Sequence, residues 1–129
     1  MGDRLIEAAR AARENAYAPY SHYAVGAALE TADGRIFSGA NVENAALGLT
    51  NCAERVALGS AVAAGAREFT RIVIVTDSSP AAAPCGACRQ VLAEFSGNMA
   101  VEAVGPSGVR RWQLAELLPD AFGTADLAR

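Results

Sequence analysis

The segment "TRIVIVTDSSPAAAPCGACRQVLAEFSGNMAVEAV", residues 70–104, determines the fold that we expect for this chain. Its start, "TRIVIVTD", contains an uninterrupted apolar run at 72–75, which is typical of a strand buried on both faces. Residues 86–96 place apolar side chains at i, i+3, i+4 and i+7, and this spacing predicts an amphipathic helix. The stretch "MAVEAV" at 99–104 predicts a second strand. A strand, a helix and a strand in this order predict a crossover between parallel strands.

The rest of the chain supplies further strands and helices around this unit. Two short apolar runs, 24–30 and 35–40, flank the turn signal Asp33-Gly34 and predict a β-hairpin. The other predicted elements are an amphipathic helix over 3–17 capped by Asp3, an apolar helix over 52–65, a short strand at 109–112 and a helix at 113–118 that Pro119 ends. We therefore expect an α/β fold, a three-layer α/β/α sandwich with a mixed, roughly five-stranded sheet, in a single domain over 1–129.

Composition restricts the class of partner. The chain has 11 basic and 14 acidic residues and a net charge of −3, without a dense basic cluster, so we expect a small-molecule partner and no nucleic acid polymer. All basic residues other than His22 are arginine, which excludes Schiff-base chemistry through lysine. We expect no membrane span and no leader, and the odd number of cysteines, 3, favours reduced thiols in the cytoplasm over a disulfide framework.

The three cysteines predict a metal site. Cys85 and Cys88 form a Cys-x-x-Cys pair at the start of a predicted helix, where free N–H groups favour thiolates. Such a pair also serves thioredoxin-like redox chemistry or a structural zinc site, whose fourth ligand here would be His22 or a carboxylate. Cys52, at another predicted helix start, favours three thiolates with the fourth zinc position open, which is the arrangement of catalytic zinc.

Glu54 and Arg55 follow Cys52 directly, at the head of a helix that carries no charge from 56 to 66. Cys52 and Glu54 can meet one metal only if the helix end itself points into the site, where the carboxylate would carry protons for water. The alternative is an acidic first-turn residue favoured by the helix dipole. Arg55 would compensate the charge of a ligand sulfur or simply lie at the surface, and the same two alternatives apply to Arg89.

Five motifs are spread over most of the chain: "AYAPYSHYAVGAAL" (16–29), "GANVENAA" (39–46), "NCAERVAL" (51–58), "PCGACRQVLAEF" (84–95) and "ELLPDAFG" (116–123). With these motifs the chain resembles the zinc-dependent cytidine deaminases of the small homotetrameric type. The resemblance implies a hydrolase of pyrimidine salvage that converts cytidine and deoxycytidine to uridine and deoxyuridine plus ammonia. It also implies one Zn²⁺ per subunit and active sites shared between the subunits of a homotetramer.

The resemblance assigns a role to each matching residue. Cys52, Cys85 and Cys88 would hold the zinc, and Glu54 would carry protons from the zinc-activated water to N3 of the base and to the leaving amino group. The other roles are as follows: Asn41 and Glu43 bind the ribose hydroxyls, Tyr23 flanks the base, the Ala53 N–H binds the base carbonyl, and Phe122 reaches into the pocket of a neighbouring subunit.

The sequence departs from the family pattern at Leu47, where a tyrosine is usual, and at Ala40, where a cysteine is common. Leu47 removes a hydroxyl and a ring from a pocket wall between subunits. Two competing functions therefore stay open: deamination of a modified cytosine nucleoside such as a blasticidin-type antibiotic, and an inactive zinc-stabilised interaction module. The pair Phe122-Gly123 favours the cytidine group over the antibiotic group.

Overall fold

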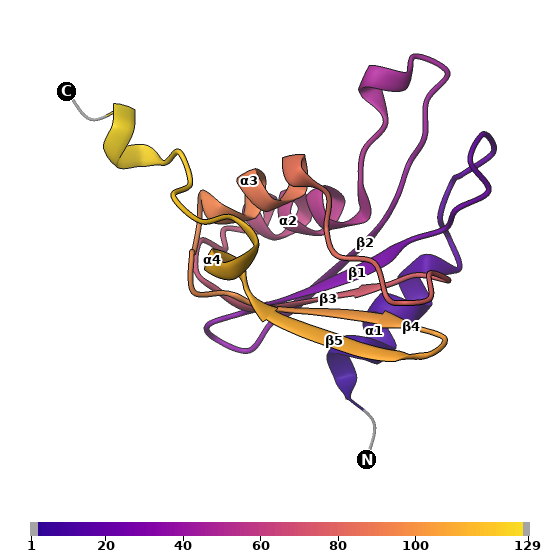
Figure 1. Cartoon of the computed structure of the whole chain (residues 1–129), viewed down its shortest axis with the longest axis horizontal. Helices are drawn as coiled ribbons and strands as arrows, with labels where there is room; N and C mark the ends of the chain where they lie inside the picture. Colours follow the sequence, from indigo (N-terminus) through magenta and orange to yellow (C-terminus); the bar gives the residue numbers. More distant parts are fainter. Residues whose placement is uncertain (1–2, 128–129) are drawn as a thin grey trace.

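The computed structural model describes residues 3–127 and shows a five-stranded sheet covered by helices (Figure 1). In chain order the elements of this part are α1 (Arg4–Arg13), β1 (Gly26–Thr31), β2 (Ile36–Ala40), the short 3-10 helix η1 (Leu47–Leu49), α2 (Ala53–Ala63), β3 (Phe69–Val75), α3 (Gly86–Ala93), β4 (Ala100–Gly105), β5 (Gly108–Gln113), α4 (Leu114–Leu117) and the 3-10 helix η2 (Thr124–Leu127). Within residues 3–127, no helix combines the length and the apolar character needed to cross a membrane.

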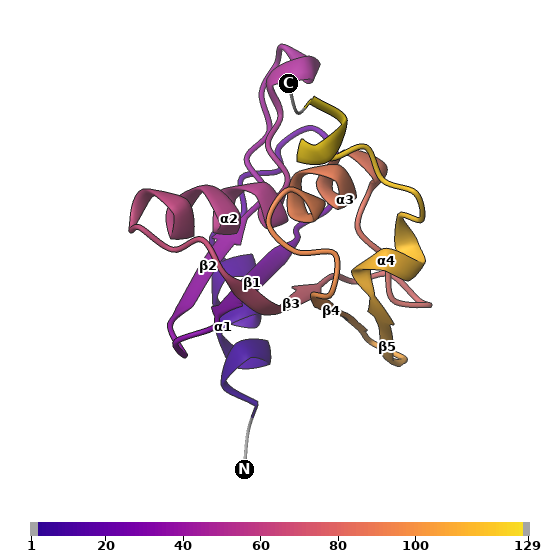
Figure 2. The same cartoon turned by 90° about the vertical axis from the view of Figure 1, so that its left-hand side faces the viewer.

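The sheet is mixed and has the strand order β2-β1-β3-β4-β5, in which only the neighbours β3 and β4 are parallel. Helix α1 covers one face, and α2 and α3 cover the other (Figures 1 and 2). The central strand β3 contributes to both sides, because Ile72 and Ile74 join the apolar cluster under α2 and α3 while Val73 and Val75 join the one under α1. This alternation confirms the strand buried on both faces and the three-layer α/β/α arrangement.

Two predicted helices end earlier than their apolar spacing suggested. The helix expected over 3–17 ends at Arg13, because Tyr17 leaves the helix to pair with the chain beyond β2: its N–H donates to the Asn41 carbonyl at 3.0 Å. The helix expected over 86–96 ends at Ala93. Neither 3-10 helix was predicted, since a single turn is too short to show an apolar period. The hairpin is confirmed, and its turn places Gly34 at φ +88°.

Gly39 sets the position of α2 on the sheet. A Cβ atom at this residue would lie 2.5 Å from the Ala57 nitrogen and 2.7 Å from the Ala53 oxygen, which is closer than side-chain carbons pack. The first turns of α2 therefore rest directly on the β2 backbone. This contact fixes where α2 begins, and with it the position of Cys52, the N-cap residue of the helix.

A partly buried ion network connects α1 to the centre of the sheet. Asp3 caps α1 by accepting hydrogen bonds from the N–H groups of Leu5 at 3.0 Å and Ile6 at 3.3 Å, which confirms the predicted cap. Arg71 on β3 forms an ion pair with the same carboxylate. Arg71 also donates two hydrogen bonds to Glu102 on β4, with Nε 2.8 Å from Oε1 and Nη2 3.0 Å from Oε2. Glu102 is buried, so Arg71 neutralises a carboxylate that water hardly reaches.

We predict that Arg71→Leu lowers the free energy of unfolding by about 2–3 kcal/mol, because it leaves Glu102 buried without its cation. The only other cation near this carboxylate within residues 3–127 is Arg111, whose Nε lies 3.9 Å away on a mostly exposed side chain. Adding Glu102→Leu should recover most of the loss, since it removes the unpaired charge. Urea unfolding of the two variants measures this, and a double variant as unstable as Arg71→Leu would contradict it.

Candidate functional site

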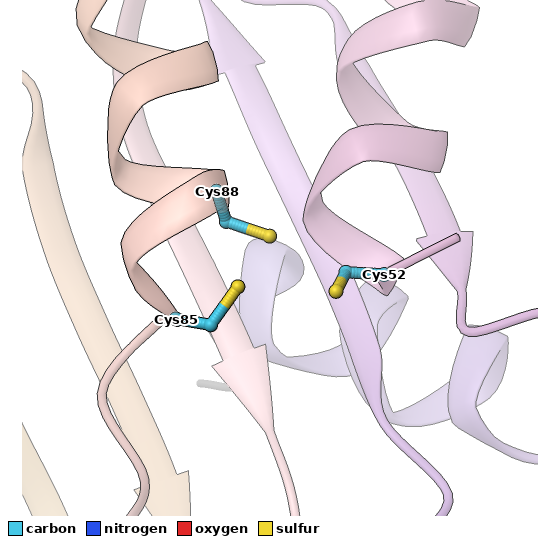
Figure 3. A group of neighbouring side chains, drawn as sticks. All are labelled: Cys52, Cys85 and Cys88. Atoms are coloured by element: carbon cyan, nitrogen blue, oxygen red, sulfur yellow. The ribbon is translucent and has the colours of Figure 1, made fainter. Parts of the chain in front are cut away.

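Two helix N-termini converge on the three cysteines. Cys52 is the N-cap residue of α2 and Cys85 that of α3, both with extended backbone angles, and neither side chain caps its own helix. Their sulfur atoms are therefore free for other contacts. Cys88 lies in the first turn of α3, and Figure 3 shows the three thiol groups pointing toward one another. The structure thus joins Cys52 to the Cys-x-x-Cys pair, as the sequence predicted.

The three sulfur atoms lie within 4.8 Å of one another, close to the separation of roughly 3.8 Å that tetrahedral Zn–S bonds of about 2.3 Å impose. Their chemistry fits the same ion, since three soft thiolates beside two helix N-termini are donors that zinc prefers. In residues 3–127 this metal-type group contains neither His22 nor a carboxylate, so a closed four-ligand structural site gains no support. His22 lies in an exposed loop at φ +58°.

The thiol groups of Cys52 and Cys88 differ in pKa. The hydrogen bond with Cys88, followed by that from Arg55, lowers the pKa of Cys52 to about 5, whereas the hydrogen bond with Cys52 raises the pKa of Cys88. The two groups titrate as a pair, and their contact favours one thiolate beside one thiol. The Arg55 guanidinium donates from Nη2 to the Cys52 sulfur at 3.4 Å. This contact is the one expected of a residue that compensates ligand charge.

Next to the cysteines lies a cavity of about 250 Å³. It is lined by residues from both helix N-termini, from β3 and from the loops around them: Ser21, Tyr23, Val25, Asn41, Glu43, Thr50, Asn51, Cys52, Ala53, Glu54, Ile74, Thr76, Ala82, Ala83 and Cys85. Cys52, Ala53 and Glu54 all line it, so the end of α2 points into the cavity. This geometry is the condition under which Cys52 and Glu54 can serve one centre.

Glu54 and Ala53 bring different chemistry to the cavity. Glu54 is only 5% exposed, and burial raises the pKa of its carboxyl group. A carboxyl group whose pKa is raised in this way can both hold and release a proton during a reaction. The Ala53 N–H, at the first position of α2, has no acceptor within the described chain, so this donor is available to a group in the cavity.

Asn41 and Glu43 enter the cavity from the chain beyond β2, which pairs with Tyr17 on one side and Asn51 on the other. The Asn41 side chain accepts from the Val25 N–H at 2.9 Å and donates to the Tyr23 carbonyl at 2.8 Å.

The Glu43 carboxylate accepts from the N–H groups of Tyr20 at 2.9 Å and Ser21 at 3.1 Å and from the Ser21 hydroxyl. The hydrogen bond from Ser21 is the main reason why the pKa of Glu43 lies below its ordinary value. Glu43 is therefore a fixed, ionised acceptor at the cavity wall.

Two further candidate residues, Phe122 and Arg89, do not line this cavity. Phe122 is exposed and does not line it; the Gln90 side chain donates to the Phe122 carbonyl at 2.7 Å. Neither alternative that the sequence left open for Arg89 is correct. Its guanidinium donates to the carbonyls of Pro84 at 2.7 Å and Leu117 at 2.9 Å, and it thereby joins the loop before Cys85 to the end of α4.

Several cavity residues were not found from the sequence. Ser21 and Thr76 are examples: Ser21 holds Glu43, and Thr76 is a buried residue that directly follows β3. The sequence offered one signal, for Thr76: residues that follow the carboxyl end of a strand tend to line sites in α/β sheets. Ala82 and Ala83 carry no such signal, because an alanine wall is recognised only from its shape.

Comparison with known proteins gives a consistent result. Residues 2–103 match the family model described as the cytidine and deoxycytidylate deaminase zinc-binding region. The chain is 47% identical to cytidine deaminase from Sporosarcina psychrophila, over 98% of this chain and 94% of that protein. It is 43% identical to cytidine deaminase from Mycobacterium tuberculosis strain H37Rv, over 92% of this chain and 86% of that protein.

A solved structure is similar as well. The crystal structure of cytidine deaminase from Burkholderia pseudomallei superposes with a TM-score of 0.90 at 54% sequence identity, covering 95% of this chain and 100% of that one. The fold of this chain is therefore the fold of that crystal structure.

We predict that the purified protein contains about one zinc ion per chain and that Cys88→Ala abolishes this content, because two thiolates bind zinc far more weakly than three. Atomic emission spectroscopy of protein from zinc-supplemented cultures measures the content. Circular dichroism should show that the variant keeps the secondary structure but unfolds at a lower temperature. Stoichiometric zinc in folded Cys88→Ala would contradict the site.

Proposed function

The chain belongs to the cytidine and deoxycytidylate deaminase family, and on this premise we propose that it hydrolyses cytidine and deoxycytidine to uridine and deoxyuridine with release of ammonia. One observation carries the proposal: three thiols at two helix N-termini share a cavity with the buried carboxyl group of Glu54. This combination supplies a metal site and a proton carrier side by side.

Each side chain has a task in this reaction. Cys52, Cys85 and Cys88 hold the zinc, and the bound ion acts as a Lewis acid that activates water. Glu54 takes a proton from the attacking water and delivers it to N3 of the base; it then takes the proton of the new C4 hydroxyl group and delivers it to the amino group, which leaves as ammonia while the C4 carbonyl forms. Arg55 donates to the Cys52 sulfur and so offsets the negative charge of three thiolates.

Residues that line the cavity would make the contacts with the substrate. The free Ala53 N–H donates to the base carbonyl, and the Tyr23 ring flanks the base. Asn41 and Glu43 bind the ribose hydroxyls. Their contacts within the chain leave one N–H of the Asn41 amide free to donate and a lone pair of Glu43 Oε2 free to accept.

The charge of the cavity favours nucleosides over nucleotides. Among its lining residues in the described chain none is Arg, Lys or His, whereas Glu43 and Glu54 are carboxyl groups. A 5′-phosphate would find no cation here, and like charges placed together cost several kcal/mol.

We further propose a homotetramer in the cytoplasm, working in pyrimidine salvage as one domain over 1–129. Large apolar side chains stand exposed on the chain around η1 and near the C-terminal end, among them Leu47 at 76%, Leu49 at 72% and Phe122 at 57%. Apolar surface of this kind favours burial between subunits, which would bring Phe122 to a neighbouring cavity. The free thiols of the site favour a reducing compartment.

A substrate panel tests the function. Zinc-loaded protein is mixed with cytidine, deoxycytidine, 5-methylcytidine, blasticidin S and free cytosine, and ammonia release is measured with ultraviolet absorbance. The proposal requires cytidine or deoxycytidine to be the best substrate. Preference for blasticidin S would replace it with the antibiotic deaminase, and zinc-loaded protein without turnover on any compound would replace it with the inactive module.

We predict that Glu54→Gln folds, keeps its zinc and loses about a thousandfold or more in kcat, because glutamine cannot carry a proton. Steady-state kinetics with metal analysis measures the effect. Glu43→Gln is the matched control, since its carboxylate only accepts hydrogen bonds, and it should mainly raise KM. Near-normal kcat in Glu54→Gln would refute the proton-carrier role.

We also predict that kcat/KM for deoxycytidine exceeds that for deoxycytidine 5′-monophosphate by about a hundredfold or more, because the cavity offers a phosphate two carboxyl groups and no cation. Kinetics with both compounds at constant ionic strength measures the ratio. Comparable values would mean that a cation from outside this cavity, such as one of a neighbouring subunit, reaches the phosphate.

A further inference from the structure

A continuous chain of hydrogen bonds runs along the cavity from Glu43 to Thr76. The Ser21 hydroxyl contacts the Glu43 carboxylate and accepts from the Tyr23 N–H at 3.0 Å. The Tyr23 hydroxyl shares a hydrogen bond with the Ser78 hydroxyl, and the Ser78 N–H donates to the Thr76 hydroxyl at 3.1 Å. We call these five residues the belt. All except Ser78 line the cavity.

The hydrogen bond between Tyr23 and Ser78 is the link in the belt that joins the loop before β1 to the loop after β3. Tyr23 is already fixed through its backbone, since its carbonyl accepts from Asn41 at 2.8 Å. The Tyr23 residue is 38% exposed, and within residues 3–127 its hydroxyl has Ser78 as its hydrogen-bond partner. The orientation of the ring against the cavity therefore depends on Ser78.

Ser78 is itself held firmly in place. Gly105 on β4 lets the Ser78 carbonyl approach closely, because a Cβ atom at Gly105 would lie 2.3 Å from that oxygen. The neighbouring Asp77 forms an ion pair with Arg13 at the end of α1, and Arg13 also donates from Nε to the Ala24 carbonyl at 2.9 Å. Arg13 thus joins the same two loops through Asp77 and Ala24. The Ser78 hydroxyl consequently presents a fixed partner to the Tyr23 ring.

We propose that Ser78 is a positioning residue that sets the affinity for the nucleoside by locking the Tyr23 ring as one wall of the cavity. The inference rests on the proposed function and extends it to a residue outside the cavity. The belt contains none of the cysteines and not Glu54, so the lock acts on binding and leaves the proton transfers unchanged. Without it, the ring rotates in the open cavity, and binding has to immobilise it again.

The test compares Ser78→Ala, Tyr23→Phe and the double variant in the zinc-loaded full chain. Ser79→Ala is the matched control, since Ser79 is the adjacent serine and its hydroxyl bonds Ser107 at 2.7 Å, away from the cavity. We expect each single variant to raise KM for cytidine about three- to tenfold, the range that one hydrogen bond supports, with kcat and zinc content unchanged. The double variant should be no worse than the single ones, and Ser79→Ala should match the wild type.

Ser78→Ala with wild-type KM would overturn the proposal, and so would two KM effects that multiply in the double variant. Amide hydrogen exchange provides a second readout that is independent of turnover. Ser78→Ala should accelerate exchange at residues 20–25 as well as in the loop 76–83, whereas faster exchange confined to 76–83 would count against the lock. Should the wild type deaminate no cytosine nucleoside, the proposed function fails, and the exchange pattern still decides whether Ser78 locks Tyr23.

Discussion

The meeting of two helix N-termini, those of α2 and α3, is the constraint on which the site depends. Cys52 and Cys85 cap these helices without bonding to them, so their sulfur atoms and the free N–H groups of both first turns face one small volume. Anionic ligands are stabilised there by both helices. The arrangement requires α2 to lie at a fixed height on the sheet, and Gly39 allows this because a side chain at that position would collide with Ala53 and Ala57. A glycine on an edge strand therefore determines where a cysteine on the next helix lies.

The fold and the metal site were largely predictable from the sequence, because both depend on local patterns. The apolar run of β3, the Asp33-Gly34 turn and the spacing of Cys85 and Cys88 each report on a few consecutive residues, and the structure agrees with all of them. The prediction that Cys52 shares a site with this pair rested on chemistry, since a third thiol at a helix start has few other uses. Helix ends were less predictable: α1 ends at Arg13 because the following residues pair with a segment that lies far ahead in the chain.

The contacts that shape the cavity could not be predicted, because they join side chains to distant backbone groups. Glu43 binds the N–H groups of Tyr20 and Ser21, 23 and 22 residues earlier in the chain, and no periodicity encodes such a pair. Arg89 illustrates the same limit. Its place beside Cys88 suggested a contact with sulfur, yet its guanidinium reaches the Pro84 and Leu117 carbonyls and so braces the loop that carries Cys85. Adjacency in sequence to a ligand is a weak guide to contact with it.

Two carboxyl groups share the cavity, and their surroundings divide the work between them. Glu43 accepts two backbone N–H bonds and a hydroxyl bond, which favour the ionised form and lower its pKa. Glu54 is buried, and burial favours the neutral form and raises its pKa. A group that only accepts hydrogen bonds from sugar hydroxyls works best when it is always ionised and cannot move. A proton carrier instead has to exist in both forms within one turnover, so its environment must not stabilise the carboxylate strongly. The backbone donors that hold Glu43 would therefore disable Glu54, and the fold supplies them to Glu43 from the loop before β1.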